Sequence, residues 1–184
     1  MFNIFGEEEF KPIKKFGIEV PNYFISKDGR VLSTRTSKPK ILNPTYETLE
    51  HGYKVPHKIG LRVSRTDTPE LFEEYNYNTS QQNIVNDPDS KYYHKLTKDP
   101  NLTTISIKYH RAVMEVWKPI DEYPPIPKED WDKCPESAKQ FIRDSAVIDH
   151  IDNNTRNNHV DNLKWTTNKD NNGHRKKYRV DTSN

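Results

Sequence analysis

The chain has 184 residues, of which 32% are hydrophobic and 30% are charged, and its net charge is +2. This length suits one ordinary domain or a small domain with an extension, and the low hydrophobic share argues against one large core, so we expect small, locally packed units spread over a partner. The sequence has no apolar stretch long enough to span a membrane, which excludes a membrane span. Its one cysteine, Cys134, excludes an intramolecular disulfide and a multi-cysteine zinc site. Together with the lack of a signal-peptide pattern, these features favour an intracellular, cytoplasmic protein.

Charge is distributed unevenly along the chain. Residues 1–60 hold 10 Lys and Arg against 7 Asp and Glu, residues 61–148 hold 12 against 15, and residues 149–184 hold 7 against 5. Basic ends around an acidic middle suggest an anionic partner that touches both ends. Ordinary solvated surface charge explains the same counts equally well.

Residues 1–63 are predicted to form a small antiparallel β-sheet. A short strand over 22–26, an Asp28-Gly29 turn and a returning strand over 30–33 have the pattern of a β-hairpin. Further strands are expected over 52–55 and 59–63. A twisted basic ribbon of this kind can lie along a DNA groove, so this segment is a candidate DNA-binding module. Its candidate DNA contacts are Lys27, Arg30, Arg35, Lys38, Lys40, Lys54, Lys58 and Arg62.

Residues 64–101 have a different composition. They are rich in Asp, Glu, Asn, Pro and Tyr and show weak periodicity. A segment of this length without regular structure is unusual in a compact domain. We therefore expect an irregular insertion, whose acidity suggests that it faces away from a nucleic-acid backbone.

Residues 102–184 are predicted to begin with a strand and two helices. The β-branched alternation over 103–109 predicts the strand, and apolar residues on one face predict a helix over 110–117 that Pro119 ends. Four prolines make residues 119–130 a stiff connector. A second helix is expected over 136–144.

The segment 147–175 contains the residues with the clearest chemistry. Between Asp149 and Asn172 there are 8 Asn and 4 Asp, residues that suit turns and whose oxygens are hard metal ligands. Apolar residues over 147–151 and 163–165 predict two strands around this polar loop. Thr167 and Asp170 resemble a capping box, so a helix is expected next.

This segment resembles the HNH endonuclease motif, also called the ββα-metal fold. Counting along the chain, 12 positions separate His150 from Asn162 and 9 separate Asn162 from Asn171. Both separations fit HNH homing endonucleases in which Asn replaces the last His. The matching residues are Asp149 and His150 on the first strand, residues 157–163 leading into the second, residues 165–167, and Asn171 on the helix.

The resemblance extends upstream of the motif. Residues 23–33, 52–53 and 59–61 look like the small N-terminal DNA-binding module often fused to phage and intron-encoded HNH enzymes, and residues 109–113 look like the helix that precedes the nuclease motif there. One departure is Asn153, which stands where the family usually has Gly and can still adopt a left-handed turn. The resemblance implies an α+β fold: a small N-terminal antiparallel sheet, then helices, then a C-terminal ββα-metal motif.

The resemblance also implies roles for individual residues. His150 would be the general base that takes a proton from the attacking water, and Asn162 would fix the loop so that His150 is oriented. Asp149 and Asn171 would bind a divalent metal, Mg²⁺ or Mn²⁺, with a distorted strand end bringing Asp149 to the site. His174 is a possible accessory residue, more plausibly a phosphate contact or a partner of the helix C-terminus.

The sequence thus predicts a metal-dependent endonuclease that binds double-stranded DNA. The basic tail is expected to contact phosphates, and its residues are Arg175, Lys176, Lys177 and Arg179. The alternatives are a non-catalytic DNA-binding protein on an HNH scaffold and an RNA-directed nuclease. The target site, nicking against double-strand cleavage, and monomer against homodimer stay open.

Overall fold

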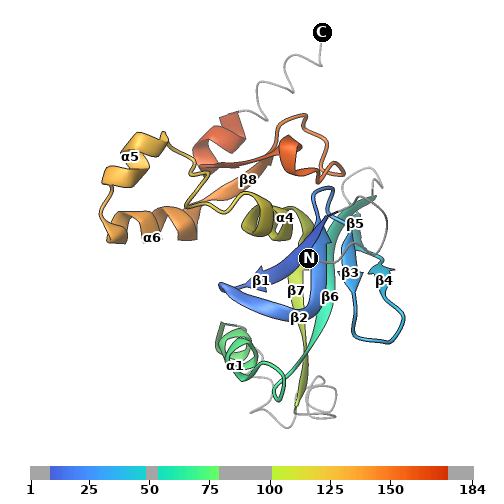
Figure 1. The fold of residues 1–184 in the computed structure, drawn as a ribbon. Coiled ribbons are helices and arrows are strands. Elements are labelled where there is room, and N and C mark those ends of the chain that lie inside the picture. Colours follow the sequence, from blue (N-terminus) through green and yellow to red (C-terminus); the bar gives the residue numbers. More distant parts are fainter. Residues whose placement is uncertain (1–8, 49–53, 79–100, 174–184) are drawn as a thin grey trace, which may run out of the picture.

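The computed structural model describes residues 9–48, 54–78 and 101–173 (Figure 1). It confirms the predicted fold class: an N-terminal antiparallel sheet is followed by helices and a C-terminal ββα unit. In these ranges the strands form sheets of four, three and two strands, and neighbouring strands within each sheet are antiparallel.

The first sheet has the order β1-β2-β3-β4. Its strands are β1 (Phe10–Lys15), β2 (Ile18–Ser26), β3 (Val31–Ser33) and β4 (Lys40–Leu42). The predicted β2–β3 hairpin is confirmed, and Gly29 in its turn has a φ of +85°. Such a left-handed conformation favours glycine, which has no Cβ to clash with the backbone. Strand β1 was not predicted, although Phe10 and Ile13 are its buried residues.

The second sheet has the order β5-β6-β7. Its strands are β5 (Thr45–Thr48), β6 (Lys54–Ser64) and β7 (Leu102–Lys108). The two strands expected over 52–55 and 59–63 are one continuous strand from Lys54 onward, and residues 52 and 53 lie outside the described ranges. Pro56 is accommodated because the β5–β6 register shifts beside its partner Tyr46, and irregular pairing tolerates a missing N–H donor.

The expectation of little regular structure over 64–101 is wrong for its first part. Helix α1 (Pro69–Asn78) forms there and packs against β2 and β6. Its buried residues Leu71, Phe72 and Tyr75 follow an i, i+1, i+4 pattern, which places them on one face of a helix. Residues 79–100 lie outside the described ranges.

Three helices precede the ββα unit: α4 (Tyr109–Trp117), α5 (Lys128–Lys133) and α6 (Glu136–Ser145). Helices α4 and α6 agree with the predictions. Helix α5 was not expected, because it begins inside the proline-rich connector, directly after Pro127. It is anchored by the buried Trp131, and α5 and α6 form a lobe beside the sheets (Figure 1). None of the helices in the described ranges is long and apolar enough to cross a membrane.

The C-terminal unit consists of two short strands and a helix. Strands β8 (Val147–His150) and β9 (Leu163–Thr166) pair antiparallel, and residues 168–173 begin the helix. The helix start is capped as predicted, because the Thr167 hydroxyl accepts a hydrogen bond from the Asp170 N–H at 3.2 Å. Asn153 has a φ of 58°, which confirms the expected left-handed turn after β8.

One hydrophobic cluster joins the N-terminal sheets to the ββα unit. It contains residues of β1, β2, β6, β7 and α1 together with Ile148, Val160, Leu163 and Trp165. The expectation of small, locally packed units is therefore wrong. The reason is α4, whose buried Ala112, Val113 and Met114 lie between the two parts and contact β1, β2, β6, β7 and β9 (Figure 1).

The shared cluster predicts that the two parts unfold together. Leu163 is 1% exposed in β9, and Leu163→Ala should lower the free energy of unfolding by about 2–5 kcal/mol because it opens a cavity in this cluster. Urea unfolding followed by tryptophan fluorescence and by circular dichroism of the sheets should give coincident transitions.

The matched control is Ile151→Ala, because Ile151 follows β8 but is 47% exposed. It should change the unfolding free energy by at most about 0.5 kcal/mol. Two separate transitions for the wild-type protein would contradict a shared core.

Candidate functional site

Strand β8 ends at two adjacent buried polar residues. Asp149 is 4% exposed and His150 is 8% exposed. Residues with such side chains are rarely buried unless they have partners or a function. The β8–β9 pairing runs in regular register to His150, where it meets Leu163. The expected distortion is therefore not in the pairing itself, and the chain turns directly after His150, over residues 151–153.

The imidazole of His150 is held by the side chain of Asn158. His150 Nε2 and Asn158 Oδ1 are 3.1 Å apart, and Asn158 is itself 6% exposed. An amide oxygen can only accept a hydrogen bond, so this contact requires the proton of the neutral ring on Nε2. Nδ1 then carries the lone pair, and this nitrogen is the one able to accept a proton.

A second histidine packs against the same ring. His110 lies in the first turn of α4, and the His110 and His150 ring centroids are 5.6 Å apart at an interplanar angle of 79°. This edge-to-face contact restricts rotation of the His150 ring. The site is therefore built from α4 as well as from the ββα unit.

The loop between β8 and β9 is organised by Asn162. Its side-chain amide donates to Asp152 Oδ1 at 2.8 Å and to the Asn157 carbonyl at 2.9 Å, while its oxygen accepts from the Asp152 N–H at 3.0 Å. Asn162 thus bridges both ends of the loop, an arrangement consistent with the predicted orienting role. Its side chain acts on the loop backbone, whereas Asn158 contacts the ring itself.

Asp152 is the acceptor at the centre of this loop. Burial acts to raise the pKa of its carboxyl, but hydrogen bonds from the Asn157 side chain, the Asn154 N–H and the Asn162 side chain outweigh burial and lower the pKa. Two of these bonds, from Asn157 and Asn154, are both 2.8 Å long. The high density of Asn and Asp in this segment therefore has a structural cause: the amides complete the hydrogen bonds of a polar loop.

Asn171 has a free oxygen in a buried position. The residue is 8% exposed, and among the described residues its Oδ1 has no hydrogen-bond partner. Burying a polar oxygen without a partner costs free energy unless an ion or a water molecule contacts it. Asn171 Oδ1 is therefore an oxygen atom that a bound cation or a water molecule could contact.

The donor set can be tested against a divalent metal. Asp149 supplies a buried carboxylate and Asn171 a buried amide oxygen, and Mg²⁺ takes oxygen ligands while keeping several waters. In the described part of the chain no three His, Cys, Asp or Glu side chains converge, so a zinc-type ligand cluster is not found there. The residues present fit a weakly held Mg²⁺ or Mn²⁺.

Lys164 is the cross-strand neighbour of Asp149. Its Nζ lies 3.4 Å from Asp149 Oδ2, and the lysine side chain is 50% exposed. The ammonium offsets the charge of the buried carboxylate. Because the lysine side chain is half exposed and flexible, it can leave the carboxylate when another cation arrives.

A basic cavity lies between the first and second sheets. It has a volume of about 330 Å³, and Arg35, Lys40 and Arg62 contribute its charged groups. The Tyr23 hydroxyl accepts a hydrogen bond from the Arg62 N–H at 3.0 Å and joins the two sheets at this point. The residues that line the cavity are Tyr23, Ser33, Arg35, Thr36, Lys40, Leu42, Gly60, Arg62 and Thr104.

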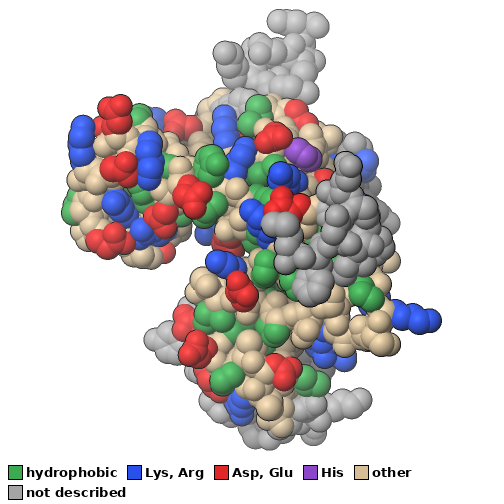
Figure 2. Space-filling model, viewed as in Figure 1, with side chains coloured by type: hydrophobic (Ala, Val, Ile, Leu, Met, Phe, Trp, Pro, Cys, Tyr) green, Lys and Arg blue, Asp and Glu red, His purple; other side chains and the backbone are tan. Residues whose placement is uncertain are grey.

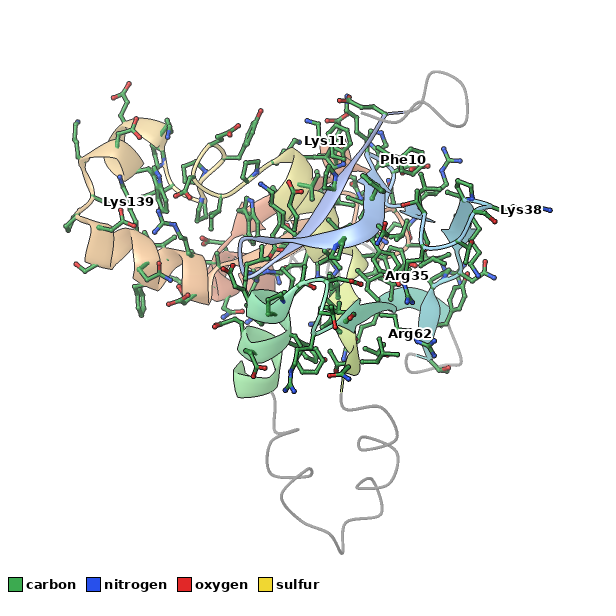
Figure 3. The ribbon with its side chains drawn as sticks, turned by 60° about the horizontal axis from the view of Figure 1, so that its bottom comes forward. Phe10, Lys11, Arg35, Lys38, Arg62 and Lys139 are labelled. Atoms are coloured by element: carbon green, nitrogen blue, oxygen red, sulfur yellow. The ribbon has the colours of Figure 1, made fainter. Side chains whose placement is uncertain are left out.

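The structure brings only some of the predicted DNA contacts together. Arg35, Lys38 and Arg62 lie on the same side of the molecule, and Lys139 lies at the opposite end (Figure 3). Over α5 and α6, basic and acidic side chains are mixed (Figure 2). The cavity therefore groups three cations with no acidic residue among its described lining residues, unlike the α5–α6 lobe.

The other predicted basic contacts have separate positions. Lys27 and Arg30 lie in the β2–β3 turn, where Lys27 is 3.9 Å from Glu9 and Arg30 is 2.9 Å from Asp28. Lys58 is exposed on β6. The side chain of Lys54 is outside the described part, as are His174, Arg175, Lys176, Lys177 and Arg179.

Sequence reasoning missed three residues of this site. The motif includes Asn158 only within the range 157–163, and neither His110 nor Lys164 is assigned a role from the sequence. No sequence signal distinguishes Asn158 from the other asparagines of the loop. His110 could have been found from the motif-like residues 109–113, because their helix directly precedes the nuclease segment.

Comparisons with known proteins give one family match and one similar solved structure. The sequence model of the HNH endonuclease family matches residues 120–173, which include His150, Asn162 and Asn171. No curated protein sequence matches the chain. A solved structure described as DNA binding and cleavage by the HNH homing endonuclease I-HmuI is similar at a TM-score of 0.44 and 21% identity. That match covers 92% of this chain but 59% of the other, so this chain spans under two thirds of that protein.

The unpartnered oxygen of Asn171 predicts metal binding that can be measured directly. Asn171→Leu removes the oxygen while keeping the size of the side chain, and it should weaken Mn²⁺ binding at least about tenfold, a magnitude seen when metal-site residues are lost. Isothermal titration calorimetry and Mn²⁺ electron paramagnetic resonance give the affinity without DNA.

The matched control is Asn172→Leu, since Asn172 is the next residue and is exposed. It should bind Mn²⁺ as the wild type does. Equal affinities for all three proteins would exclude Asn171 as a ligand.

Proposed function

We propose that this chain, whose residues 120–173 form an HNH endonuclease domain, is a metal-dependent endonuclease that cuts or nicks double-stranded DNA. The observation that carries the proposal is the state of His150: a buried imidazole held through Nε2 by Asn158, beside the buried carboxylate of Asp149. A solvated surface histidine would have no need of such a setting.

His150 is the general base in this proposal. A water molecule placed at Nδ1 gives its proton to the ring, and the resulting hydroxide forms a bond to phosphorus while the P–O3′ bond breaks. Asn158 keeps Nδ1 unprotonated by occupying the Nε2–H, and His110 limits rotation of the ring. The 3′ oxygen that leaves receives its proton from solvent.

Asp149 and Asn171 are the proposed metal ligands. Divalent metals are used generally by HNH nucleases, and a bound Mg²⁺ or Mn²⁺ would stabilise the negative charge on the phosphate and the leaving oxygen. Asn162 holds the loop that carries Asn158, through its bonds to Asp152 and the Asn157 carbonyl. Lys164 keeps the Asp149 carboxylate charge-balanced when no metal is bound.

DNA is the proposed partner of the basic cavity. Arg35, Lys40 and Arg62 converge there without an acidic residue among the described lining residues. Phosphate groups are the anions that a duplex presents at regular intervals, and Arg and Lys bind them without regard to sequence. The cavity thus supports positioning of the duplex backbone. Lys27, Arg30, Lys38 and Lys58 are further proposed contacts on the N-terminal sheets.

The base assignment predicts a large loss of cleavage. His150→Ala should reduce plasmid nicking in Mg²⁺ or Mn²⁺ by at least about 10²-fold, because general-base catalysis contributes roughly 10²–10⁴. Duplex binding should stay within a few-fold of wild type. The measurement is nicking of supercoiled plasmid, with EDTA added to one sample of each protein.

The control is His159→Ala, because His159 lies in the same loop with a side chain that is 44% exposed. It should nick as the wild type does. Asp149→Ala should lose metal-dependent nicking. A wild-type protein that binds duplex DNA but never nicks it would favour the non-catalytic DNA-binding alternative.

The cavity predicts a sequence-independent loss of affinity. Arg62→Gln should weaken binding to duplexes of different sequence by a similar factor, and the slope of log K against log salt should fall by about 1. Fluorescence anisotropy at several salt concentrations measures both quantities. Lys139→Gln removes one positive charge at the opposite end of the molecule (Figure 3) and should leave the slope unchanged. Equal effects of the two variants would mean that the cavity is no special phosphate site.

A further inference from the structure

The turn between β2 and β3 touches the loop that holds His150. The Val160 N–H donates a hydrogen bond to the Lys27 carbonyl at 2.8 Å. This bond joins the N-terminal sheet to the short helical turn Val160–Asn162 that precedes β9. Residues more than 130 positions apart in the sequence are thus linked backbone to backbone, beside the candidate base.

Gly29 brings the same turn against Asn158. A Cβ built on Gly29 would lie 3.2 Å from Asn158 Cβ, 3.5 Å from Val113 Cγ2 and 3.7 Å from the Asn158 carbonyl oxygen. The shortest of these distances is below ordinary van der Waals contact, so Asn158 would have to move by a few tenths of an ångström. A side chain at position 29 would therefore press on Asn158.

The turn is stiff enough to act as a support. The Ser26 N–H donates to the Arg30 carbonyl at 3.0 Å, the Gly29 N–H donates to the Ser26 carbonyl at 3.1 Å, and the Arg30 N–H donates to the Ser26 hydroxyl at 3.0 Å. Ser26 is fully buried, and its hydroxyl also bonds the Asp28 carboxylate. Because these bonds hold the turn from inside, it would resist displacement by the loop more than an open turn would.

Asn158 has little freedom between its two neighbours. The turn meets its backbone and Cβ on one side, and on the other side its Oδ1 accepts a hydrogen bond from His150 Nε2 at 3.1 Å. A shift of Asn158 is therefore passed to the ring through this hydrogen bond. Val113, which also faces Gly29, lies on the helix whose first turn carries His110.

We propose that the Ser26–Arg30 turn of the N-terminal sheet is a positioning element for the His150 imidazole, acting through the backbone and side chain of Asn158. This inference rests on the proposed function, because that function makes the His150 ring the general base. It adds that the N-terminal module sets the geometry of the chemical step, so that its contribution is more than binding of DNA. Gly29 and Asn158 are its positioning residues.

The test compares two glycines that share a backbone conformation. Gly29 has a φ of +85° and Gly17 a φ of +78°, but a Cβ on Gly17 would meet no described atom within 4 Å. Gly17→Ala should therefore lose only the stability that an alanine at positive φ loses. Gly29→Ala should lose the same stability and also displace Asn158. The pair separates positioning from loss of stability.

Two readouts are measured on both variants. Single-turnover nicking with saturating protein should fall roughly tenfold in Gly29→Ala, given that a misplacement of 1 Å can cost about 10²-fold, while duplex affinity stays within about twofold. The second readout is the long-range ¹H–¹⁵N spectrum of the histidine rings, recorded without metal or DNA. The His150 signals are assigned by their loss in His150→Gln. They should show the Nε2–H form of the ring in the wild type and in Gly17→Ala. Gly29→Ala should show a mixture of ring tautomers.

A second variant covers the case in which Gly29→Ala does not fold. Val160→Pro removes the N–H that bonds Lys27, and proline suits this first helical position because the preceding His159 has a ψ of 137°. It should change the His150 ring signals and the nicking rate in the same direction. Unchanged ring signals in every folded variant would overturn the proposal.

The route through Asn158 is tested by a double-mutant cycle. Once Asn158→Ala has removed the bond to His150, adding Gly29→Ala should reduce nicking little further. An undiminished tenfold loss in that background would overturn the role of Asn158. If the wild-type protein does not nick DNA at all, the proposed function fails, and the ring spectra still decide whether the turn positions the imidazole.

Discussion

Burial of α4 is the constraint on which this structure depends. The helix has apolar residues on several sides, and Ala112, Val113 and Met114 are buried between the N-terminal sheets and the ββα unit. Hydrogen bonds at its C-terminal end connect it to both parts. The Trp117 indole N–H donates to the Ile25 carbonyl of the N-terminal sheet at 3.3 Å. The indole N–H of the tryptophan in β9 donates to the Lys118 carbonyl at 2.7 Å. A two-stranded unit is marginally stable by itself, so the candidate active site owes its rigidity to the surface on which it is packed.

The low hydrophobic share of the sequence is compatible with this core because the loop between β8 and β9 is stabilised by polar contacts. Asp152 and Asn162 exchange hydrogen bonds in both directions, and Asn157 closes the loop on the Asp152 carboxylate. Such hydrogen-bond networks stabilise a protein only when nearly every polar group in them has a partner. Asn171 differs from these loop residues, since among the described residues its Oδ1 has no hydrogen-bond partner. The contrast between a satisfied loop and an unsatisfied helix residue is the observation that supports Asn171 as a proposed metal ligand.

Local patterns were sufficient to predict much of the fold from sequence. The Asp28-Gly29 turn, the helix ended by Pro119 and the capped helix after Thr167 each follow from a few neighbouring residues. Helix α1 and strand β1 were missed because each has only a few apolar residues among polar ones. Their packing partners, β2 and β6 for α1 and β2 and α4 for β1, cannot be read from the local pattern. The same holds for the site. Motif spacing indicated His150, whereas the role of Asn158 depends on how the loop folds and on a glycine in another sheet.

The proposed DNA contacts and the proposed general base are connected through one turn in this architecture. Lys27 and Arg30, both proposed DNA contacts, flank the glycine that abuts Asn158, and the carbonyl of Lys27 is bonded to Val160. A phosphate drawn to either side chain would act on a turn whose backbone already touches the loop of the candidate base. Lys118 strengthens the same junction, since its Nζ donates to the Val160 carbonyl at 2.9 Å. Backbone contacts change little with side-chain rotamer, so this link would hold the ring in one orientation while the flexible cations adjust to the duplex.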